Sequence, residues 1–297
     1  GSPLPTSHLV AWYPFDFNAS NYASNIGNGT IYGPVSFVSA NKSLSNEGSV
    51  SSLGGAYFSG YGSNITIHTS KPLLTGNQAT LAVWIRWNGG KHESGSCCGT
   101  RQEILGADSS PGKEVNPIIA VNDSGTDEAE TWVCTKNSCW PEARSLPNTI
   151  IPGEWYFLVS RYNGTALSLW INGKQEAVAG VTGNLTLMGN GNYTYIGSRS
   201  NTGSYFNGTI VNAQIYNTSL SASQIQDLYK EGISGMPVDF KNLVGWWPLD
   251  GNAQAYNFNM SSGMPTNVNY VGIASSKPSL FEPSLNGSGV NFNGQSG

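Results

Sequence analysis

The sequence predicts an all-β protein built as a two-sheet antiparallel β-sandwich, and three observations support this fold class. Short segments with strand character recur along the chain, and turn residues separate them. Two Asn-Gly pairs lie between such segments, where tight hairpin turns require positive φ angles. Aromatic residues make up 11% of the 297 residues, which is enough to build a core.

The strands predicted most clearly are segments that alternate in polarity or form short apolar runs. In residues 80–87, alternate side chains from Leu81 to Ile85 fall on one side. Asn163-Gly164 and Asn172-Gly173 predict two-residue type I′ turns between strands. The expected strands cover residues 63–67, 80–87, 155–162, 166–171, 174–178, 193–197 and 208–216.

One helix is predicted after the last of these strands. Ser221 is a favourable N-cap, and Gln224 occupies the capping-box position three residues later. Leu220, Ile225 and Leu228 form an apolar stripe, so we expect this short helix to cover one end of the sandwich.

An internal repeat divides the chain. Residues 9–19 are similar to residues 243–253, and Phe58-Ser59-Gly60 is similar to Phe292-Asn293-Gly294 at the same offset of 234 residues. We therefore expect a tag or linker over 1–8, a complete domain over 9–234, a linker over 235–242 and a second, partial repeat of the same domain over 243–297. An unpaired sheet edge is a template for another strand. The partial repeat could pack on the first domain, continue in a longer parent chain, or be completed by another chain through self-assembly.

The composition narrows the classes of function. Charged residues make up 11% of the chain, whereas about a quarter is usual. The formal net charge of −4 excludes a basic nucleic-acid-binding protein. No apolar run reaches the length of about 18 residues that spans a membrane, so we expect no membrane insertion.

Twelve Asn-x-Ser/Thr sequons indicate a glycosylated protein at an extracellular or cell-surface location. Turns rich in Asn, Gly, Ser and Thr would also produce such triplets by chance. The candidate glycosylation sites are Asn18, Asn28, Asn41, Asn64, Asn122, Asn163, Asn184, Asn192, Asn207, Asn217, Asn259 and Asn286.

The four cysteines agree with an oxidising location. Cys97 and Cys98 are adjacent, and Cys134 and Cys139 lie five residues apart. An even count in a chain with few charges predicts two disulfides. Because a vicinal bond would be strained, we favour cross-links from the first pair to the second. The alternative is a four-cysteine zinc site, which an adjacent pair fits poorly.

A set of segments carries a resemblance to a known family: residues 9–16, 79–86, 155–159, 169–174, 195–198, 206–210, 215–217 and 220–225. In this order they resemble the laminin-G-like / concanavalin-A-like lectin-glucanase superfamily. The resemblance covers about residues 9–232 and implies a jelly-roll arrangement of the two sheets. It leaves function open, because this fold hosts lectins, adhesion modules, hydrolases and spacers.

The resemblance also implies one structural calcium ion at the rim of the sandwich. Its protein ligands would be Asp16 in the first strand and Asn212 in the last long strand, together with backbone carbonyls. Asn212 stands where the family often has an Asp, and carboxylates set calcium affinity. The alternative for Asp16 is a cap on the turn that follows its strand.

Two segments, 88–101 and 133–147, look inserted relative to the family's core strands. Trp132 and Trp140 flank the second cysteine pair, and aromatic rings stack on sugar faces. We therefore expect a sugar or protein site in which both rings act with Arg101, Glu130 and Arg144. The alternative is that the tryptophans pack over the disulfides as a small satellite core. The loop before the last long strand adds the amide of Asn201 and the phenol of Tyr205 as candidates for hydroxyl recognition.

The enzymatic alternative lacks its motif. Glucanases of the superfamily use Glu-x-Asp-x-x-Glu on one strand, and the sequence does not contain it. The nearest acidic run, residues 127–130, is interpreted as a solvated loop. We expect an extracellular recognition or adhesion module that binds glycans or a glycosylated cell-surface protein, and no enzyme. The alternatives are a structural subunit of a filament or surface layer and a glycoside hydrolase.

Overall fold

The computed structural model describes residues 8–13, 15, 19, 28–44, 48–90, 100–108, 114–122, 125–186, 192–199, 203–234, 268–271 and 289–292. The chain separates into two compact units. The larger unit consists of Pro5–Ala40 and Leu53–Gln226, and the smaller consists of Gly1–Leu4, Asn41–Ser52 and Asp227–Gly297.

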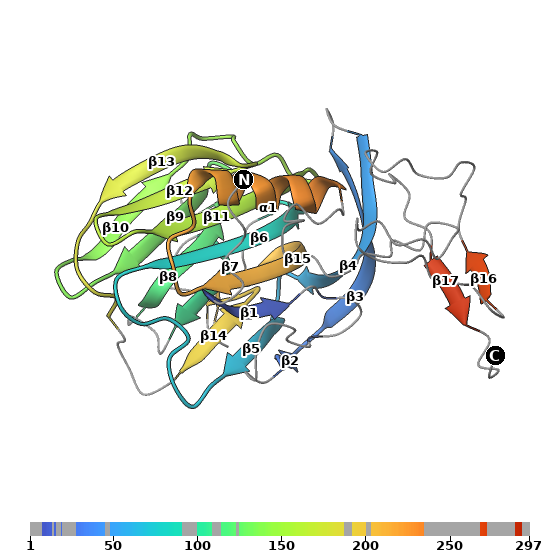
Figure 1. The fold of residues 1–297 in the computed structure, drawn as a ribbon, viewed down its shortest axis with the longest axis horizontal. Helices are drawn as coiled ribbons and strands as arrows, with labels where there is room; N and C mark the ends of the chain where they lie inside the picture. Colours follow the sequence, from blue (N-terminus) through green and yellow to red (C-terminus); the bar gives the residue numbers. More distant parts are fainter. Residues whose placement is uncertain are drawn as a thin grey trace, which may run out of the picture. The chain divides into compact units, whose positions relative to one another are not determined.

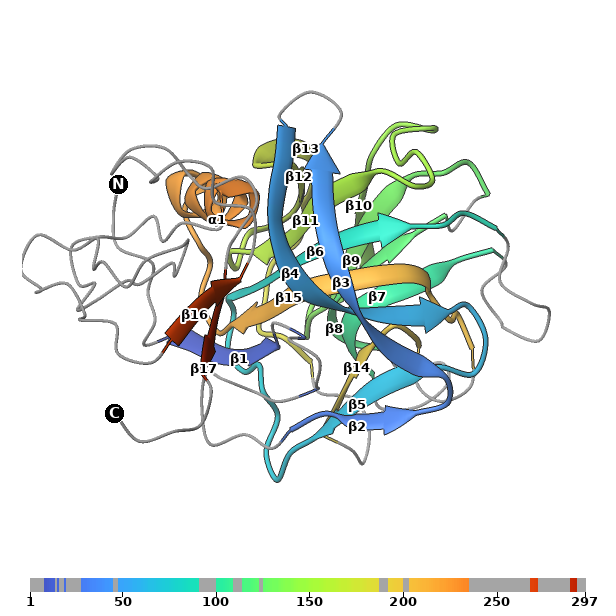
Figure 2. The ribbon, with the colours of Figure 1, turned by 90° about the vertical axis from the view of Figure 1, so that its right-hand side faces the viewer.

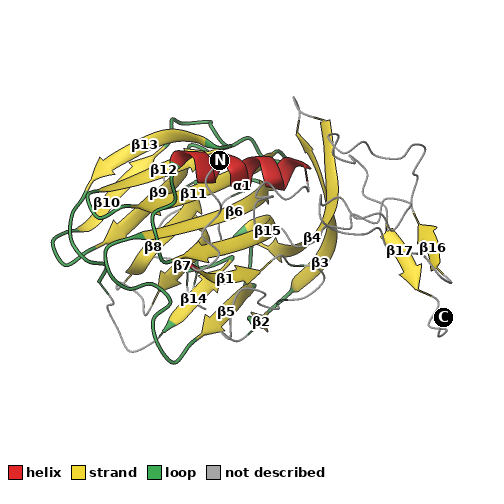
Figure 3. Ribbon diagram, in the orientation of Figure 1, coloured by secondary structure: helices red, strands yellow, loops and turns green. Residues whose placement is uncertain are grey.

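The larger unit is an antiparallel β-sandwich with a jelly-roll arrangement, as predicted (Figure 1; strands are yellow in Figure 3). One sheet, here sheet A, has the order β13-β12-β11-β6-β15-β4-β3, and β1 also pairs with β15. Its strands are β1 (Leu9–Tyr13), β3 (Val35–Leu44), β4 (Gly48–Ser59), β6 (Ala79–Trp87), β11 (Trp155–Tyr162), β12 (Ala166–Ile171), β13 (Lys174–Gly180) and β15 (Asn207–Tyr216).

The second sheet, here sheet B, has the order β10-β9-β8-β7-β14-β5-β2. Figure 2 shows β2, β5 and β14 lying next to one another at one side of this sheet. Its strands are β2 (Thr30–Tyr32), β5 (Asn64–His68), β7 (Gln102–Asp108), β8 (Glu114–Val121), β9 (Ala129–Cys134), β10 (Cys139–Arg144) and β14 (Tyr193–Ile196).

The core lies between the sheets and follows the period of two along each strand. Leu81, Val83 and Ile85 of β6 all point into it, as the alternation predicted. Sheet B contributes the alternate residues Ala129 and Val133 of β9. The largest fully buried aromatic side chains include Tyr13, Phe15, Phe58, Trp87, Tyr162 and Phe206.

The two Asn-Gly turns differ from each other. Asn172 and Gly173 both have positive φ, at 51° and 76°, so this turn has the predicted conformation. At Asn163-Gly164 only Gly164 has a positive φ. Asn163 instead closes the turn from its first position: its N–H donates to the carbonyl of Ala166, and its Oδ1 atom accepts the backbone N–H groups of Thr165 and Ala166, so Gly164 and Thr165 are the central residues. The prediction of a two-residue type I′ turn at this position is therefore wrong.

Residues 133–147 continue sheet B, and their interpretation as an insertion relative to the family's core strands stays a prediction. They contribute the end of β9 and all of β10, an edge strand of the sheet. Of the other expected insertion, 88–101, the structure describes residues 88–90 and 100–101.

The predicted helix is α1 (Ala222–Ser234), and its cap is reciprocal. Ser221 Oγ accepts the N–H of Gln224, and Gln224 Oε1 accepts the N–H of Ser221. No helix in the described part of the chain is long and apolar enough to cross a membrane.

The described part of the smaller unit includes β16 (Val268–Val271) and β17 (Gly289–Phe292), which pair antiparallel. Most of residues 243–297 lie outside the described ranges. The partial repeat, its completion by another chain and the filament alternative therefore stay predictions.

A pair of glycine substitutions tests how tightly the sandwich is packed. Gly197 has a φ of +84°, and a Cβ placed on it would lie 2.4 Å from the buried ring of Phe58. Gly153 has a similar φ of +89° but open space around it. We expect Gly197→Ala to lower the free energy of unfolding by about 3 kcal/mol, because it adds overpacking to backbone strain. Gly153→Ala should cost only the strain, about 1 kcal/mol. Urea unfolding of both variants checks this, and equal losses would contradict the packing at Phe58.

Candidate ligand-binding site

The face of sheet B that points away from the core carries most of the candidate residues. Ala129 and Val133 of β9 point into the core, so Glu130 and Trp132 lie on the opposite, outer face. Arg144 of β10 is paired with Glu130. Directly opposite residues in an antiparallel pair share a face, so Arg144 extends this outer face onto β10.

Arg144 is surrounded by three carboxylates, and these four residues are here named the Arg144 cluster. Its Nη2 atom lies 3.0 Å from Glu130 Oε2, and its Nη1 atom lies 3.5 Å from Glu128 Oε1. Its Nε–H donates to Glu142 Oε1. Glu128 and Glu130 are fully buried, whereas the side chain of Arg144 is 31% exposed. The cluster therefore combines one partly exposed arginine side chain with two enclosed carboxylates.

The burial of Glu128 corrects the interpretation of residues 127–130 as a solvated loop. Thr126 Oγ1 donates to Glu128 Oε2 at 2.7 Å, and the carbonyl of Glu128 accepts the N–H of Asn122. The spacing of Glu128 and Glu130 along a strand was the signal in the sequence. Its partner, Arg144, could be found only from the register of β9 with β10.

A second charged group lies on neighbouring strands. The guanidinium of Arg101 lies 4.4 Å from the ring centre of Trp132, within the range of a cation–π contact. Arg101 Nη2 also lies 3.1 Å from Glu103 Oε1. Trp132 is 4% exposed and packs with Ile118 and Ala120 of β8. The ring of Trp132 is thus covered by its neighbours, as in a satellite core.

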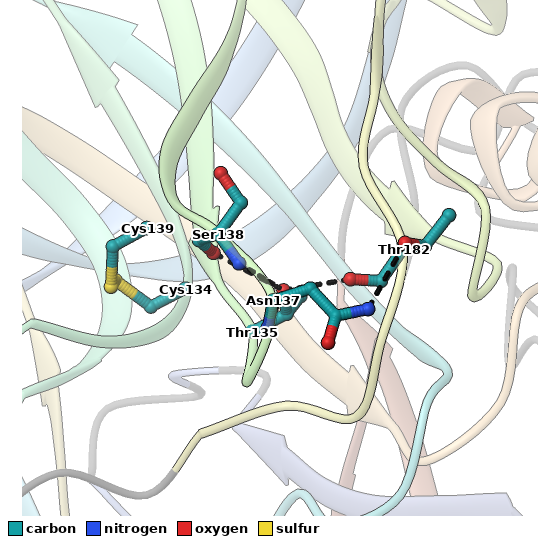
Figure 4. Close-up of a disulfide and its surroundings, with 6 residues drawn as sticks. All are labelled: Cys134, Thr135, Asn137, Ser138, Cys139 and Thr182. Carbon is teal, nitrogen blue, oxygen red and sulfur yellow. Dashed lines mark hydrogen bonds between the residues drawn. A yellow bond between two sulfur atoms is a disulfide. The ribbon is translucent and has the colours of Figure 1, made fainter.

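The second cysteine pair forms its own disulfide, Cys134–Cys139 (Figure 4). The predicted cross-links from these cysteines to Cys97 and Cys98 are therefore wrong, and so is a zinc site that uses Cys134 and Cys139. The reason is the hairpin register, which places Cys139 directly opposite Cys134. Cys97 and Cys98 themselves lie outside the described residues.

The tip of this hairpin is bonded to the segment that follows β13 (Figure 4). Thr135 Oγ1 donates to the carbonyl of Thr182 at 2.8 Å and accepts the N–H groups of Asn137 and Ser138. The N–H of Lys136 donates to the carbonyl of Asn184. A disulfide and several hydrogen bonds therefore fix the hairpin on both sides.

Trp140 follows this disulfide directly and is 51% exposed. Its φ of +75° is unusual for a bulky residue and marks local strain. The pairing of β10 with β9 shifts register between Cys139 and Glu142, which accommodates that conformation. Trp140 is thus an exposed ring on a rigid support.

The remaining candidates lie elsewhere or outside the described residues. Tyr205 lies next to Tyr61, with ring centres 6.4 Å apart, and burial followed by the charge of Tyr61 raises the pKa of Tyr205. Its hydroxyl is therefore neutral at pH 7. Asn212 Oδ1 accepts the side-chain N–H of Gln214. Asp16 and Asn201 are outside the described ranges, so calcium stays a prediction; the described residues contain no group of three His, Cys, Asp or Glu that could hold a metal.

Comparison with known proteins agrees with this architecture. Residues 59–226 match a laminin-G-type family model described as the concanavalin A-like lectin/glucanases superfamily. The chain belongs to this superfamily. A search of curated proteins found no match.

Solved structures share the superfamily fold with this member at low sequence identity. Domain 4 of AbnA, a GH43 extracellular arabinanase from Geobacillus stearothermophilus in complex with arabinotriose, is 22% identical with a TM-score of 0.52; the match covers 74% of this chain and 98% of that one. The binding domain of botulinum neurotoxin serotype G is 13% identical with a TM-score of 0.52, and the match covers 75% of this chain and 50% of that one. The receptor-binding domain of botulinum neurotoxin C/D mosaic serotype is 13% identical with a TM-score of 0.52, and the match covers 76% of this chain and 51% of that one. The chain spans about half of these toxin domains, and the likeness shows the fold alone.

Replacing Arg144 should lower the free energy of unfolding, because the buried carboxylates lose their cation. Arg144→Met removes the cation beside Glu128 and Glu130, and breaking a buried ion pair costs about 3 to 5 kcal/mol of unfolding free energy. The loss should shrink as the pH falls toward the ordinary glutamate pKa of about 4.3, because a protonated carboxyl needs no cation. Chemical unfolding at several pH values measures this. Arg86→Met, at an exposed arginine of sheet A, is the control and should cost less than about 1 kcal/mol.

The disulfide should stabilise the hairpin by a modest amount. Its short loop predicts that Cys134→Ala together with Cys139→Ala lowers the free energy of unfolding by about 2 kcal/mol. The N–H of Lys136 should also exchange faster with solvent, because its bond to Asn184 depends on the hairpin tip. Thermal unfolding and amide hydrogen exchange give the two measurements. Unchanged exchange at Lys136 would mean that the contacts with residues 182–186 alone fix the tip.

Proposed function

We propose that the chain is an extracellular recognition module that binds carbohydrate without catalysing a reaction. The ligand contacts the outer face of sheet B around Arg144. The observation that carries this proposal is the Arg144 cluster, in which a partly exposed arginine side chain is oriented by two fully buried carboxylates. The superfamily and the lectin-like fold support it.

The chemistry of this face suits sugar hydroxyls. A guanidinium offers several N–H donors in a fixed plane, and a carboxylate accepts hydrogen bonds from hydroxyl groups. Arg144 and Glu142 are both partly exposed, at 31% and 38% of their side chains. Glu128 and Glu130 lie behind them and fix the orientation of Arg144, which reduces the entropy lost on binding. Trp140, at the other end of β10, would add a ring for a ligand long enough to span the strand.

The same geometry argues against glycoside hydrolysis. A retaining or inverting glycosidase needs one carboxyl group that is protonated and donates its proton to the leaving group. Glu128 and Glu130 are both fully buried and lie within salt-bridge distance of Arg144, so neither presents a carboxyl group to a bound ligand. These carboxylates are therefore suited to holding Arg144 and accepting hydrogen bonds.

The extracellular location is proposed from two features of the chain. The Cys134–Cys139 disulfide requires an oxidising compartment to persist. The sequons would be used only on a secretory route.

The test is an array of immobilised oligosaccharides that includes arabino-oligosaccharides, chosen because the arabinanase domain is in complex with arabinotriose. We expect binding to at least one oligosaccharide class. Arg144→Lys keeps the charge but loses the planar fork, so it should raise the Kd about tenfold, equivalent to about 1.4 kcal/mol. Trp140→Ala should have a smaller effect that grows with the length of the ligand.

The matched control is Arg161→Lys, the same substitution on sheet A near the Tyr162–Ala79 pair, which should leave the Kd unchanged. Circular dichroism and the unfolding midpoint establish that each variant is folded. No binding to any oligosaccharide, or equal Kd values for Arg144→Lys and the wild type, would overturn the proposal.

A further inference from the structure

We infer that N-linked glycans occupy one end of the sandwich and leave the opposite end bare, so that the carbohydrate ligand approaches from the bare end. The ligand part of this inference rests on the proposed function, whereas the distribution of glycans does not. The argument uses the sequons whose asparagine side chains the structure describes.

The strand register defines the two ends. Along β11 and β6, Tyr162 pairs with Ala79 at one end, and Trp155 pairs with Arg86 at the other. The first, here named the tip end, also contains the hairpin tip and residues 181–185, since Val181 N–H donates to the carbonyl of Thr165. The second, here named the loop end, is formed by residues 59–63, 87–90, 122, 125–128, 145–153 and 204–207, which backbone and side-chain hydrogen bonds join to one another.

Four sequon asparagines lie at the tip end, and each has solvent access. Asn184 and Asn217 are exposed, and Asn163 and Asn192 are half-buried. Asn163 uses its Oδ1 atom for the turn before β12, whereas a glycan is attached through the amide nitrogen. Asn28 is also exposed. The pairing of Tyr32 with Asn64 and of Thr30 with Thr66 shows that β2 runs away from Asn28 toward the loop end.

Three sequon asparagines lie at the loop end, and the side chain of each is buried or hydrogen-bonded to a neighbouring loop. Asn64 is 1% exposed, and Asn122 is 4% exposed. The amide nitrogen of Asn122 donates to the carbonyl of Gly90, and that of Asn207 donates to the carbonyl of Gly89 at 3.0 Å. A glycan cannot be accommodated in a closed interior. Folding therefore requires the amides of Asn64 and Asn122 to be unmodified, whereas Asn207 is half-buried and its amide nitrogen is used in the bond to Gly89.

The Arg144 cluster lies next to the loop end. Glu128 lies in its loops, because the N–H of Asn122 donates to the carbonyl of Glu128. Arg144 lies one residue before Ser145, whose N–H donates to the carbonyl of Ala129. Tyr61, Leu146 and Ile151 add exposed apolar surface on the same loops. The occupant we assign to this end is a carbohydrate chain borne by another surface, which needs an approach free of the module's own glycans.

The first experiment maps glycosylation without any ligand. The protein is secreted from a host that adds N-linked glycans, and glycopeptide mass spectrometry measures the occupancy of each sequon. We expect occupancy among Asn163, Asn184, Asn192 and Asn217, and none at Asn64, Asn122 or Asn207. Occupancy at any of these last three in the folded, secreted protein, or none at the tip end, would overturn the inference.

The second experiment moves a glycan to the bare end. Pro147→Asn creates a sequon with Thr149 in an exposed loop at the loop end. Ser221→Asn creates one with Ser223 beyond the tip-end strands, and Asn is as good an N-cap as Ser. The probe is the oligosaccharide that the wild type binds best on the array. We expect the glycan at position 147 to weaken binding by about tenfold or more, with recovery after enzymatic deglycosylation. The glycan at position 221 should leave binding unchanged.

The outcomes separate the inference from the proposed function. Weaker binding with the glycan at position 221, or unchanged binding with a confirmed glycan at position 147, would overturn the direction of approach. If the wild type binds no oligosaccharide, the proposed function fails and the direction of approach fails with it. The glycopeptide map still decides whether the glycans are confined to the tip end.

Discussion

The antiparallel register between β9 and β10 is the constraint on which the candidate site depends. It places Cys139 opposite Cys134, which allows the disulfide, and Arg144 opposite Glu130, which allows the ion pair. A shift by one residue would turn Arg144 toward the core and Ala143 toward the outer face. The register therefore determines at once which cysteines are bonded and which charges meet. The disulfide at one end of the hairpin and the charged cluster at the other hold the same alignment.

The Arg144 cluster is difficult to explain as a stabilising feature alone. Two buried carboxylates and a partly exposed guanidinium lose hydration on folding, and their mutual attraction often only offsets that loss. Apolar residues of similar volume on β9 and β10 would satisfy packing at lower cost. In the core, by contrast, two neutral hydroxyl groups satisfy each other across the sheets, since Thr131 Oγ1 and Ser160 Oγ lie within hydrogen-bond distance. Charges kept on the outer face, with one charged side chain partly exposed, agree with the proposed recognition of a ligand.

The parts of the structure that the sequence predicted are those that local pattern determines. The alternation from Leu81 to Ile85 and the reciprocal cap of Ser221 and Gln224 need only neighbours in the chain, and both are confirmed. The strands β7 to β10 were missed because charged residues such as Glu103 and Glu130 interrupt an apolar pattern. Their burial depends on partners from other strands. The disulfide pairing was wrong because register is a property of the folded sheet, although two cysteines five residues apart suit a hairpin.

The placement of sequons follows the same logic on a larger scale. The triplets look equivalent in the sequence, yet the fold encloses Asn64 and Asn122 and leaves Asn184 and Asn217 at the surface. An N-linked glycan fits on a short, exposed turn at the end of a strand. It does not fit on an asparagine that is buried between loops joined by hydrogen bonds. At the loop end the amides of Gln102, Asn122 and Asn207 are used to join those loops through the carbonyls of Gly89 and Gly90. In the distribution of glycans that we infer, the hydrogen bonds that fix these loops also keep this end free of glycans, and a rigid, uncovered surface loses the least entropy when it binds.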